Sequence, residues 1–294
     1  MHLRRSVFAS LATAVTAAVS LTASSGDFVL LEVPGFTQTI PSGVNDRGDV
    51  VGSAIRCSVD PGTGDLVFES RGFLYKNGEY GVVEMPGAVN GPTLTDINAS
   101  GSIVGYFTAS DGVHGFTLHR GRMEPLSSAA DPDLALVPQG INARGDIVGW
   151  IPPTGSEGYR AFVMVEGDVS ILSVPSGSIA LQAWGINASG VVVGSGFSSA
   201  LGTFSFGYRD GQFATVPLAG SLIDVNDRGD LLAEIPGGVP PSVIYRKASG
   251  WTAELAAGEY QVTDIANRWL VGLAPQLTLP NGCAQSFGFA LRWN

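Results

Sequence analysis

Residues 140–149 read GINARGDIVG, and this stretch recurs along the chain with few changes. The other clear copies are GVNDRGDVVG (43–52), DINASGSIVG (96–105), GINASGVVVG (185–194) and DVNDRGDLLA (224–233). A sixth copy, DIANRWLVG (264–272), is one residue shorter and has Ala266 in the Asn position. A repeat of roughly 40–45 residues indicates one repetitive domain rather than several unrelated ones.

Each copy has the chemistry of a β-hairpin. An apolar residue precedes Asn-x-x-Gly, and aliphatic residues, mostly β-branched, follow it. An Asn side chain can hydrogen-bond backbone two residues ahead, and glycine adopts positive φ at no steric cost. β-Branched residues favour a pleated, half-buried strand. We therefore expect strand, turn and strand in every copy.

A second, aromatic segment lies between the copies, for example RGFLYKNGEYGVVEMPG (71–87) and YRAFVMVEGDVSILSVPSG (159–177). It contains two strand-like runs around a Gly-containing turn, which is again a hairpin. Two hairpins give four strands per repeat, the pattern of a propeller blade. The sequence predicts an all-β, six-bladed β-propeller. Another repetitive β architecture, a solenoid or a sandwich, is the alternative.

The aromatic triplets RGF (71–73), HGF (114–116) and RAF (160–162), followed by Ile-Asn-x-x-Gly-x-Ile-Val-Gly turns, resemble the HAF repeat family of bacterial extracellular proteins. The resemblance covers residues 28–294, with the fifth and sixth copies degraded. It implies export from a bacterium and a repetitive β fold. It implies no settled activity.

The two ends of the chain each resemble half of an aromatic hairpin. DFVLLEVPG (27–35) is similar to its second strand, and SFGFALRWN (286–294) is similar to its first. Paired, they would complete one blade and remove a free edge strand, which otherwise promotes aggregation. We expect five continuous blades and a composite blade closed by both termini, with 43–52 as the remaining hairpin of that composite blade.

Residues 1–25 have the layout of a secretory signal peptide. Arg4 and Arg5 precede an uncharged run from Val7 to Ala23, and small residues follow it. The run is short for a membrane span and diluted by Ser and Thr, so we expect cleavage rather than anchoring. The predicted organisation is a signal peptide (1–25) and a single β-propeller domain of six repeats (26–294) that is secreted or periplasmic.

Composition limits the partners. The chain has 16 basic and 26 acidic residues, a net charge of −10, with only 14% charged residues and 40 glycines. An acidic surface without basic clusters repels phosphate backbones and anionic lipid headgroups. We expect an unknown extracellular ligand or protein as partner, no nucleic acid, and no membrane insertion after signal cleavage.

Several polar motifs invite functional interpretations that we weigh against structural ones. RGD tripeptides at 47–49, 144–146 and 228–230 share one hairpin turn, so we interpret them as turn geometry with water-facing neighbours rather than adhesion motifs. The acidic turns lack the six or more converging oxygens of a calcium site. Asp96, Asp224 and Asp264 occupy one repeat slot. We expect them to bond turn backbone, with a ring of channel ligands as the rival interpretation.

No catalytic constellation stands out. His114 and His119 lie in one predicted strand at an odd separation, so they point to opposite faces and form no shared metal site. No nucleophile elbow, phosphate loop or zinc motif is present. We assign no catalytic, cofactor-binding or metal residue.

The favoured function is an exported, non-catalytic binding or scaffold propeller for a glycan, peptide or cell-surface partner. The alternative is a carboxylate-dependent hydrolase or lyase acting on a glycan or lactone in the central channel.

Cys57 and Cys283 are the only two cysteines. An even count in an oxidising compartment predicts a disulfide. Ring closure would bring them together although they are far apart in sequence. We expect both in long inter-blade connections, roughly 54–69 and 274–286, where the bond would staple the composite blade.

Overall fold

The computed structural model describes residues 28–155, 157–172, 178–218, 220–235, 237, 241–247, 252–255, 260–274 and 277–293. The predicted signal peptide (1–25) lies outside these ranges. No helix in the described part of the chain is long and apolar enough to cross a membrane.

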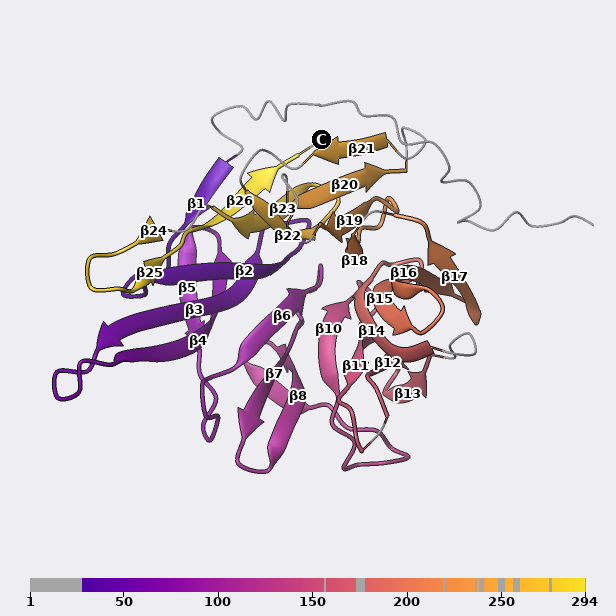
Figure 1. The fold of residues 1–294 in the computed structure, drawn as a ribbon, viewed down its shortest axis with the longest axis horizontal. Coiled ribbons are helices and arrows are strands. Elements are labelled where there is room, and N and C mark those ends of the chain that lie inside the picture. Colours follow the sequence, from indigo (N-terminus) through magenta and orange to yellow (C-terminus); the bar gives the residue numbers. More distant parts are fainter. Residues whose placement is uncertain are drawn as a thin grey trace, which may run out of the picture.

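The described chain forms six four-stranded antiparallel sheets arranged in a ring, a six-bladed β-propeller (Figure 1). We number the blades in chain order and give their strands from the centre outwards. Blade 1 contains β2 (Gln38–Val44), β3 (Val50–Val59), β4 (Leu66–Lys76) and β5 (Glu79–Val83); blade 2 contains β6 (Thr93–Ile97), β7 (Ile103–Ala109), β8 (Gly112–His119) and β9 (Arg122–Pro125); blade 3 contains β10 (Val137–Ile141), β11 (Ile147–Ile151), β12 (Arg160–Val165) and β13 (Asp168–Ile171).

Blade 4 contains β14 (Ser178–Ile186), β15 (Val192–Ser198), β16 (Gly202–Arg209) and β17 (Gln212–Val216); blade 5 contains β18 (Ser221–Val225), β19 (Leu231–Glu234), β20 (Ser242–Arg246) and β21 (Thr252–Leu255); blade 6 contains β22 (Gln261–Ile265), β23 (Trp269–Leu273), β26 (Gly288–Arg292) and β1 (Phe28–Leu31). A short pair, β24 (Leu277–Thr278) and β25 (Ala284–Gln285), lies in the connection between β23 and β26.

Blade 6 confirms that both termini share one blade, because β1 pairs with β26. The prediction that 43–52 is its remaining hairpin is wrong: those residues form the β2–β3 hairpin of blade 1. The turn of 264–272 joins β22 to β23 and supplies the inner half of blade 6. The reason is chain order. In every blade the Asn turn precedes the aromatic hairpin, so the last turn belongs with the last aromatic strand.

The last glycine of the repeat and the aromatic residue of the next hairpin are packing partners. In five blades this glycine pairs in register with a buried Phe, as Gly52 does with Phe73. A Cβ on Gly52 would lie 2.1 Å from the Ile40 carbonyl oxygen and 2.8 Å from the Phe73 ring, closer than atoms can approach. Blade 5 has Ala233 there, opposite the smaller Val243. The exchange of Gly–Phe for Ala–Val therefore keeps the volume at this contact nearly constant.

Candidate functional site

The Asn-x-x-Gly turns meet around the central axis and form a hub. In the turn of blade 3, the Asn142 side-chain oxygen accepts hydrogen bonds from the backbone N–H groups of Arg144 and Asp146, both at 3.0 Å. Gly145 has φ +89°, in the left-handed region that glycine adopts without strain. Local turn chemistry is therefore as the sequence predicts.

The same Asn side chains also join neighbouring blades, which the sequence analysis missed. The Asn142 amide donates to the backbone carbonyl of Asn187 in the next blade at 3.1 Å. Four such bonds, at 3.0–3.1 Å, link blades 1 to 5 through Asn45, Asn98, Asn142, Asn187 and Asn226. All five residues are buried. The recurrence of Asn at the same position of five repeats pointed to this inter-blade role, because a hairpin turn alone would also accept Asp or Ser there.

The sixth turn uses different residues for the same purpose. Ala266 has no amide, and the turn is one residue shorter, closing with a bond from the Ala266 N–H to the Trp269 carbonyl. The Ala266 carbonyl accepts its bond from the Trp293 indole at 3.1 Å. Asn267 bonds Asp46 of blade 1 through both its backbone N–H (2.8 Å) and its side-chain amide (2.7 Å). A C-terminal residue and Asn267 thus take over the role of the missing Asn.

The RGD tripeptides are structural, but not in the way the sequence analysis expected. Their aspartates, Asp49, Asp146 and Asp230, are only 3–5% exposed, so they do not face water. Each accepts a hydrogen bond from the Asn amide of its own turn. Buried carboxylates with internal partners are not available to an adhesion receptor, which supports the interpretation as turn geometry.

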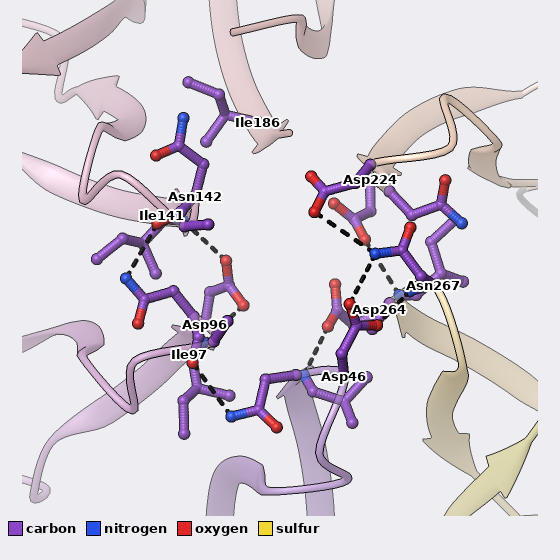
Figure 2. A pocket seen from close by; sticks show the side chains of 18 of the residues that line it. Asp46, Asp96, Ile97, Ile141, Asn142, Ile186, Asp224, Asp264 and Asn267 are labelled. Atoms are coloured by element: carbon purple, nitrogen blue, oxygen red, sulfur yellow. Dashed lines mark hydrogen bonds between the residues drawn. The ribbon is translucent and has the colours of Figure 1, made fainter. Parts of the chain in front are cut away.

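Asp96, Asp224 and Asp264 do bond backbone, and the bonds cross between blades. Asp264 accepts from the Val44 N–H (2.7 Å), Asp96 from the Ile141 N–H (2.7 Å), and Asp224 from the Ile265 N–H (3.1 Å). Each acceptor lies on the innermost strand of one blade and its donor on that of the next (Figure 2). The prediction that these residues bond backbone is thus correct, but these bonds go to the neighbouring blade.

The three carboxyl groups also share one electrostatic environment. Burial raises the pKa of all three, and mutual repulsion adds to the effect for Asp96 and Asp264. The pKa of Asp96 rises to about 7. All three carboxyl groups therefore hold a proton more tightly than an exposed aspartate does.

The space between these carboxyl groups is small. The hub encloses a cavity of about 80 Å³, lined by the Asn turns and the three aspartates. Ligand pockets typically measure about 300–1,000 Å³, so this cavity has room for a few water molecules and not for a sugar or lactone ring. Asp46 and Asp227 at its mouth are bonded to Asn267 as well. The hub can hold blades together and store protons, but its carboxylates are engaged with backbone and with one another.

The two histidines have separate partners. His114 contacts Asp111 at 2.8 Å and stacks on Phe107, whereas His119 contacts the Ser102 hydroxyl at 2.8 Å. Within the described residues, no group of three or more His, Cys, Asp or Glu side chains converges in a way that could hold a metal ion.

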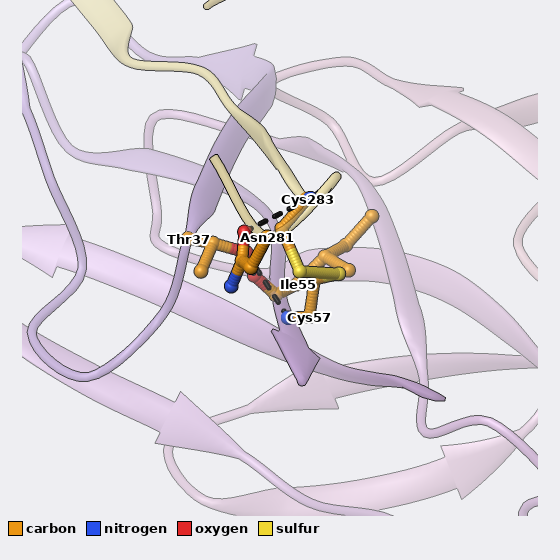
Figure 3. The surroundings of a disulfide bond; sticks show 5 residues. All are labelled: Thr37, Ile55, Cys57, Asn281 and Cys283. Atoms are coloured by element: carbon orange, nitrogen blue, oxygen red, sulfur yellow. Dashed lines mark hydrogen bonds between the residues drawn. A yellow bond between two sulfur atoms is a disulfide. The ribbon is translucent and has the colours of Figure 1, made fainter. Parts of the chain in front are cut away.

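The predicted disulfide between Cys57 and Cys283 is present, with Cα atoms 5.8 Å apart (Figure 3). Its location differs from the prediction. Cys57 lies near the end of strand β3 of blade 1, and Cys283 lies in the connection between β23 and β26 of blade 6, so neither is in a connection between blades. Both are at the end of the blade where the second strand turns into the third, and so lie on the same face of the ring. The bond crosses the junction where the ring closes, and Thr39 reinforces it by donating its N–H to the Ser286 carbonyl.

Comparisons with known proteins assign no family to this chain. No family model and no curated protein matches the chain. Similar solved structures include TolB from Acinetobacter baumannii (12% identity, TM-score 0.49, covering 84% of this chain and 64% of that chain) and XC5397 from Xanthomonas campestris, described as a gluconolactonase (12%, 0.46, 92% and 99%). A chain of a nidogen/laminin complex is similar too (12%, 0.47, 74% and 80%). This chain thus spans under two thirds of the TolB chain.

Proposed function

We propose that this protein is an exported, non-catalytic binding or scaffold propeller. The observation that carries the proposal is the state of the central channel, where a carboxylate enzyme of this shape would bind substrate. The three hub carboxyls are committed to inter-blade hydrogen bonds, and the cavity between them measures about 80 Å³. A propeller with its channel closed in this way offers its loops and blade faces to a ligand.

The disulfide supports the exported location. Disulfides persist in oxidising compartments and are rare in the reducing cytosol. The bond between Cys57 and Cys283 spans the ring closure and is nearly inaccessible to solvent, with the two residues 6% and 0% exposed. Export, the signal peptide at 1–25 and membership of the HAF repeat family remain parts of the proposal. Mass analysis of the protein secreted by its natural host tests the first two.

A paired screen tests the function. The purified mature protein is applied to arrays of glycans and peptides, and the same glycans and a set of lactones are incubated with it to detect turnover. We expect binding without turnover, and unchanged binding in the variant Asp264→Asn. Turnover that Asp264→Asn abolishes, at an unchanged melting temperature, would replace the proposal with the carboxylate-enzyme alternative.

A further inference from the structure

Blade 4 carries two hollows that lie away from the hub. A hollow of about 510 Å³ is lined by parts of β16, β17 and the start of β18, and a second of about 200 Å³ is lined by β14 and β15. Thr203 lines both, so the two adjoin. The larger one lies within the usual size range of ligand pockets, about 300–1,000 Å³.

The register of blade 4 places both hollows on its face toward blade 5. Val193 and Val216 on this face pack with Leu222 of blade 5 in one apolar cluster. Ser195 is two residues beyond Val193 and pairs with Ser205, whose hydroxyl bonds the Gly220 carbonyl and the Leu222 N–H, both at 3.0 Å. We call the region formed by the residues that line both hollows the blade-4 cleft. The Ser205 bonds join blades 4 and 5 directly at this cleft.

The lining combines hydroxyl and amide groups with an aromatic ring and contains no charged side chain. The polar side chains on the face toward blade 5 are Gln182, Ser195, Thr203 and Ser205, with Ser221 at the start of β18. Phe197 on this face is 47% exposed, whereas the register turns Phe204 and Thr215 to the opposite face, where Phe204 packs in the cluster with blade 3. Leu201 at the rim is 62% exposed.

Part of this polar lining is unused. In the described part of the chain, the side chains of Gln182 and Thr203 have no hydrogen-bond partner. Ser195 accepts the Trp184 indole N–H at 3.0 Å and keeps its own hydroxyl proton to donate. Donors and acceptors without partners, next to the exposed Phe197 ring, favour a ligand that carries hydroxyl groups on an otherwise apolar ring.

We propose that the blade-4 cleft binds an uncharged glycan, an inference that rests on the proposed binding function and names its site and ligand class. Sugar rings present hydroxyl groups at their edges and C–H groups on their faces, which match the hydroxyls and the exposed Phe197 ring. A sialylated or sulfated glycan would find no cation among the lining residues to compensate its charge. An extended peptide adding to the edge of β17 would meet Pro217, which lacks a backbone donor.

Two variants with matched controls test the cleft. Thr203→Trp fills the junction of the two hollows, and Val113→Trp makes the same change at the corresponding position of β8 in blade 2. Phe197→Ala removes the exposed ring, and Phe68→Ala removes a ring that is 56% exposed on β4 of blade 1. All four are screened on an array that holds uncharged, sialylated and sulfated glycans, and hits are measured by calorimetry.

We expect the parent to bind uncharged glycans only. Thr203→Trp should weaken this binding at least about tenfold, equivalent to about 1.4 kcal/mol. Phe197→Ala should weaken it several-fold, and both controls should leave it unchanged at equal melting temperatures. Binding that survives Thr203→Trp, or that Val113→Trp weakens equally, overturns the site. A parent that binds peptides and no glycan overturns the ligand class but leaves the binding function intact, whereas turnover of a glycan overturns the binding function itself.

Discussion

The ring has six junctions between neighbouring blades, and the two that involve blade 6, which holds both ends of the chain, are built differently from the other four. Between blades 1 and 5 the junctions repeat one device, an Asn amide that bonds the carbonyl of the next turn. At blade 6 this device is absent: the Trp293 indole bonds the Ala266 carbonyl within the blade, and the Asn267–Asp46 pair and the disulfide join blade 6 to blade 1. In blades 1 to 5 one continuous stretch of chain forms all four strands, whereas blade 6 combines β1 with β22, β23 and β26 from the other end of the chain. Strand pairing and cross-blade bonds have to hold these two parts together, which fits the departure of the blade-6 residues from the repeat.

The largest effect should come from removing the closing strand. Deleting residues 287–294 removes β26, which pairs with both β23 and β1, and also removes the Trp293 indole. Two edge strands would then be exposed, and exposed edges aggregate. We expect aggregation or loss of the cooperative unfolding transition, measured by light scattering and calorimetry. Internal deletion of 61–64 at the tip of the β3–β4 hairpin is the control and should leave the transition in place. A truncated protein that melts like the parent would mean that the ring does not depend on this strand.

Removing the disulfide should cause the second-largest loss of stability. The variant Cys57→Ala/Cys283→Ala loses a link across 226 residues, for which the chain-entropy model gives ~4–5 kcal/mol. We expect denaturant unfolding at a clearly lower midpoint, and the same shift in the parent after reduction. Peptide mapping without reductant checks the premise. Two free thiols in protein from an oxidising compartment would contradict the bond and weaken the closure that it implies.

Replacing the Asn of a regular turn should destabilise the protein more than replacing Asn267 in the sixth turn. Asn142→Ala removes four hydrogen bonds and leaves Asp146 buried with fewer partners. We expect a loss of roughly 3 kcal/mol, because each buried group left without a partner costs about 1–3 kcal/mol. Asn267→Ala is the matched change in the sixth turn, and there water can replace part of the lost bonding, so about 1 kcal/mol is expected. Equal losses in chemical denaturation would remove the distinction between the two kinds of junction.

The hub carboxyls predict a pH dependence of stability. Folding raises the pKa of Asp96 to about 7, whereas in the unfolded chain it is near 3.9. The folded state therefore keeps a proton that the unfolded state releases, and this residue makes the protein less stable as pH rises from about 4 to 7. Asp96→Asn removes the titration and can still accept the Ile141 bond. Its melting temperature should exceed that of the parent by roughly 2–5 °C at pH 7.5 and match it near pH 4.5.

The control for this titration is Asp111, whose exposed carboxyl has a pKa lowered by its hydrogen bond to His114. Asp111→Asn should change the pH dependence in the opposite direction or not measurably. A constant difference between Asp96→Asn and the parent from pH 4.5 to 8 would show that Asp96 does not titrate in this range.

The fold could be predicted from the sequence because turn chemistry and strand patterning repeat locally. Asn142 and Gly145 identify a turn without any knowledge of the neighbouring blade, and the half-motifs at the two ends are visible as sequence. The inner hairpin of blade 6 was predicted wrongly, because the Asn turn precedes the aromatic hairpin in every blade and this order also holds for the last copy. The inter-blade bonds of Asn142 and Asp96 could not be predicted, since their partners lie 45 residues away in the next repeat. The blade-4 cleft was also missed, because an empty volume depends on how whole side chains pack.

The smallest effect concerns the arginines of the RGD turns, which look identical in sequence. Arg144 pairs with Asp146 and also donates to the Ala188 carbonyl of the next blade. Arg228 occupies the same position in blade 5, and in the described part of the chain its side chain has no partner, although its backbone N–H bonds Asn267. Arg144→Lys should cost about 0.5–1 kcal/mol, since Lys lacks the planar fork that spans both acceptors. Arg228→Lys should be neutral within the error of a denaturation midpoint. If the two substitutions cost the same, the Arg144 contact to the next blade contributes nothing, and the junction rests on its Asn and Asp residues.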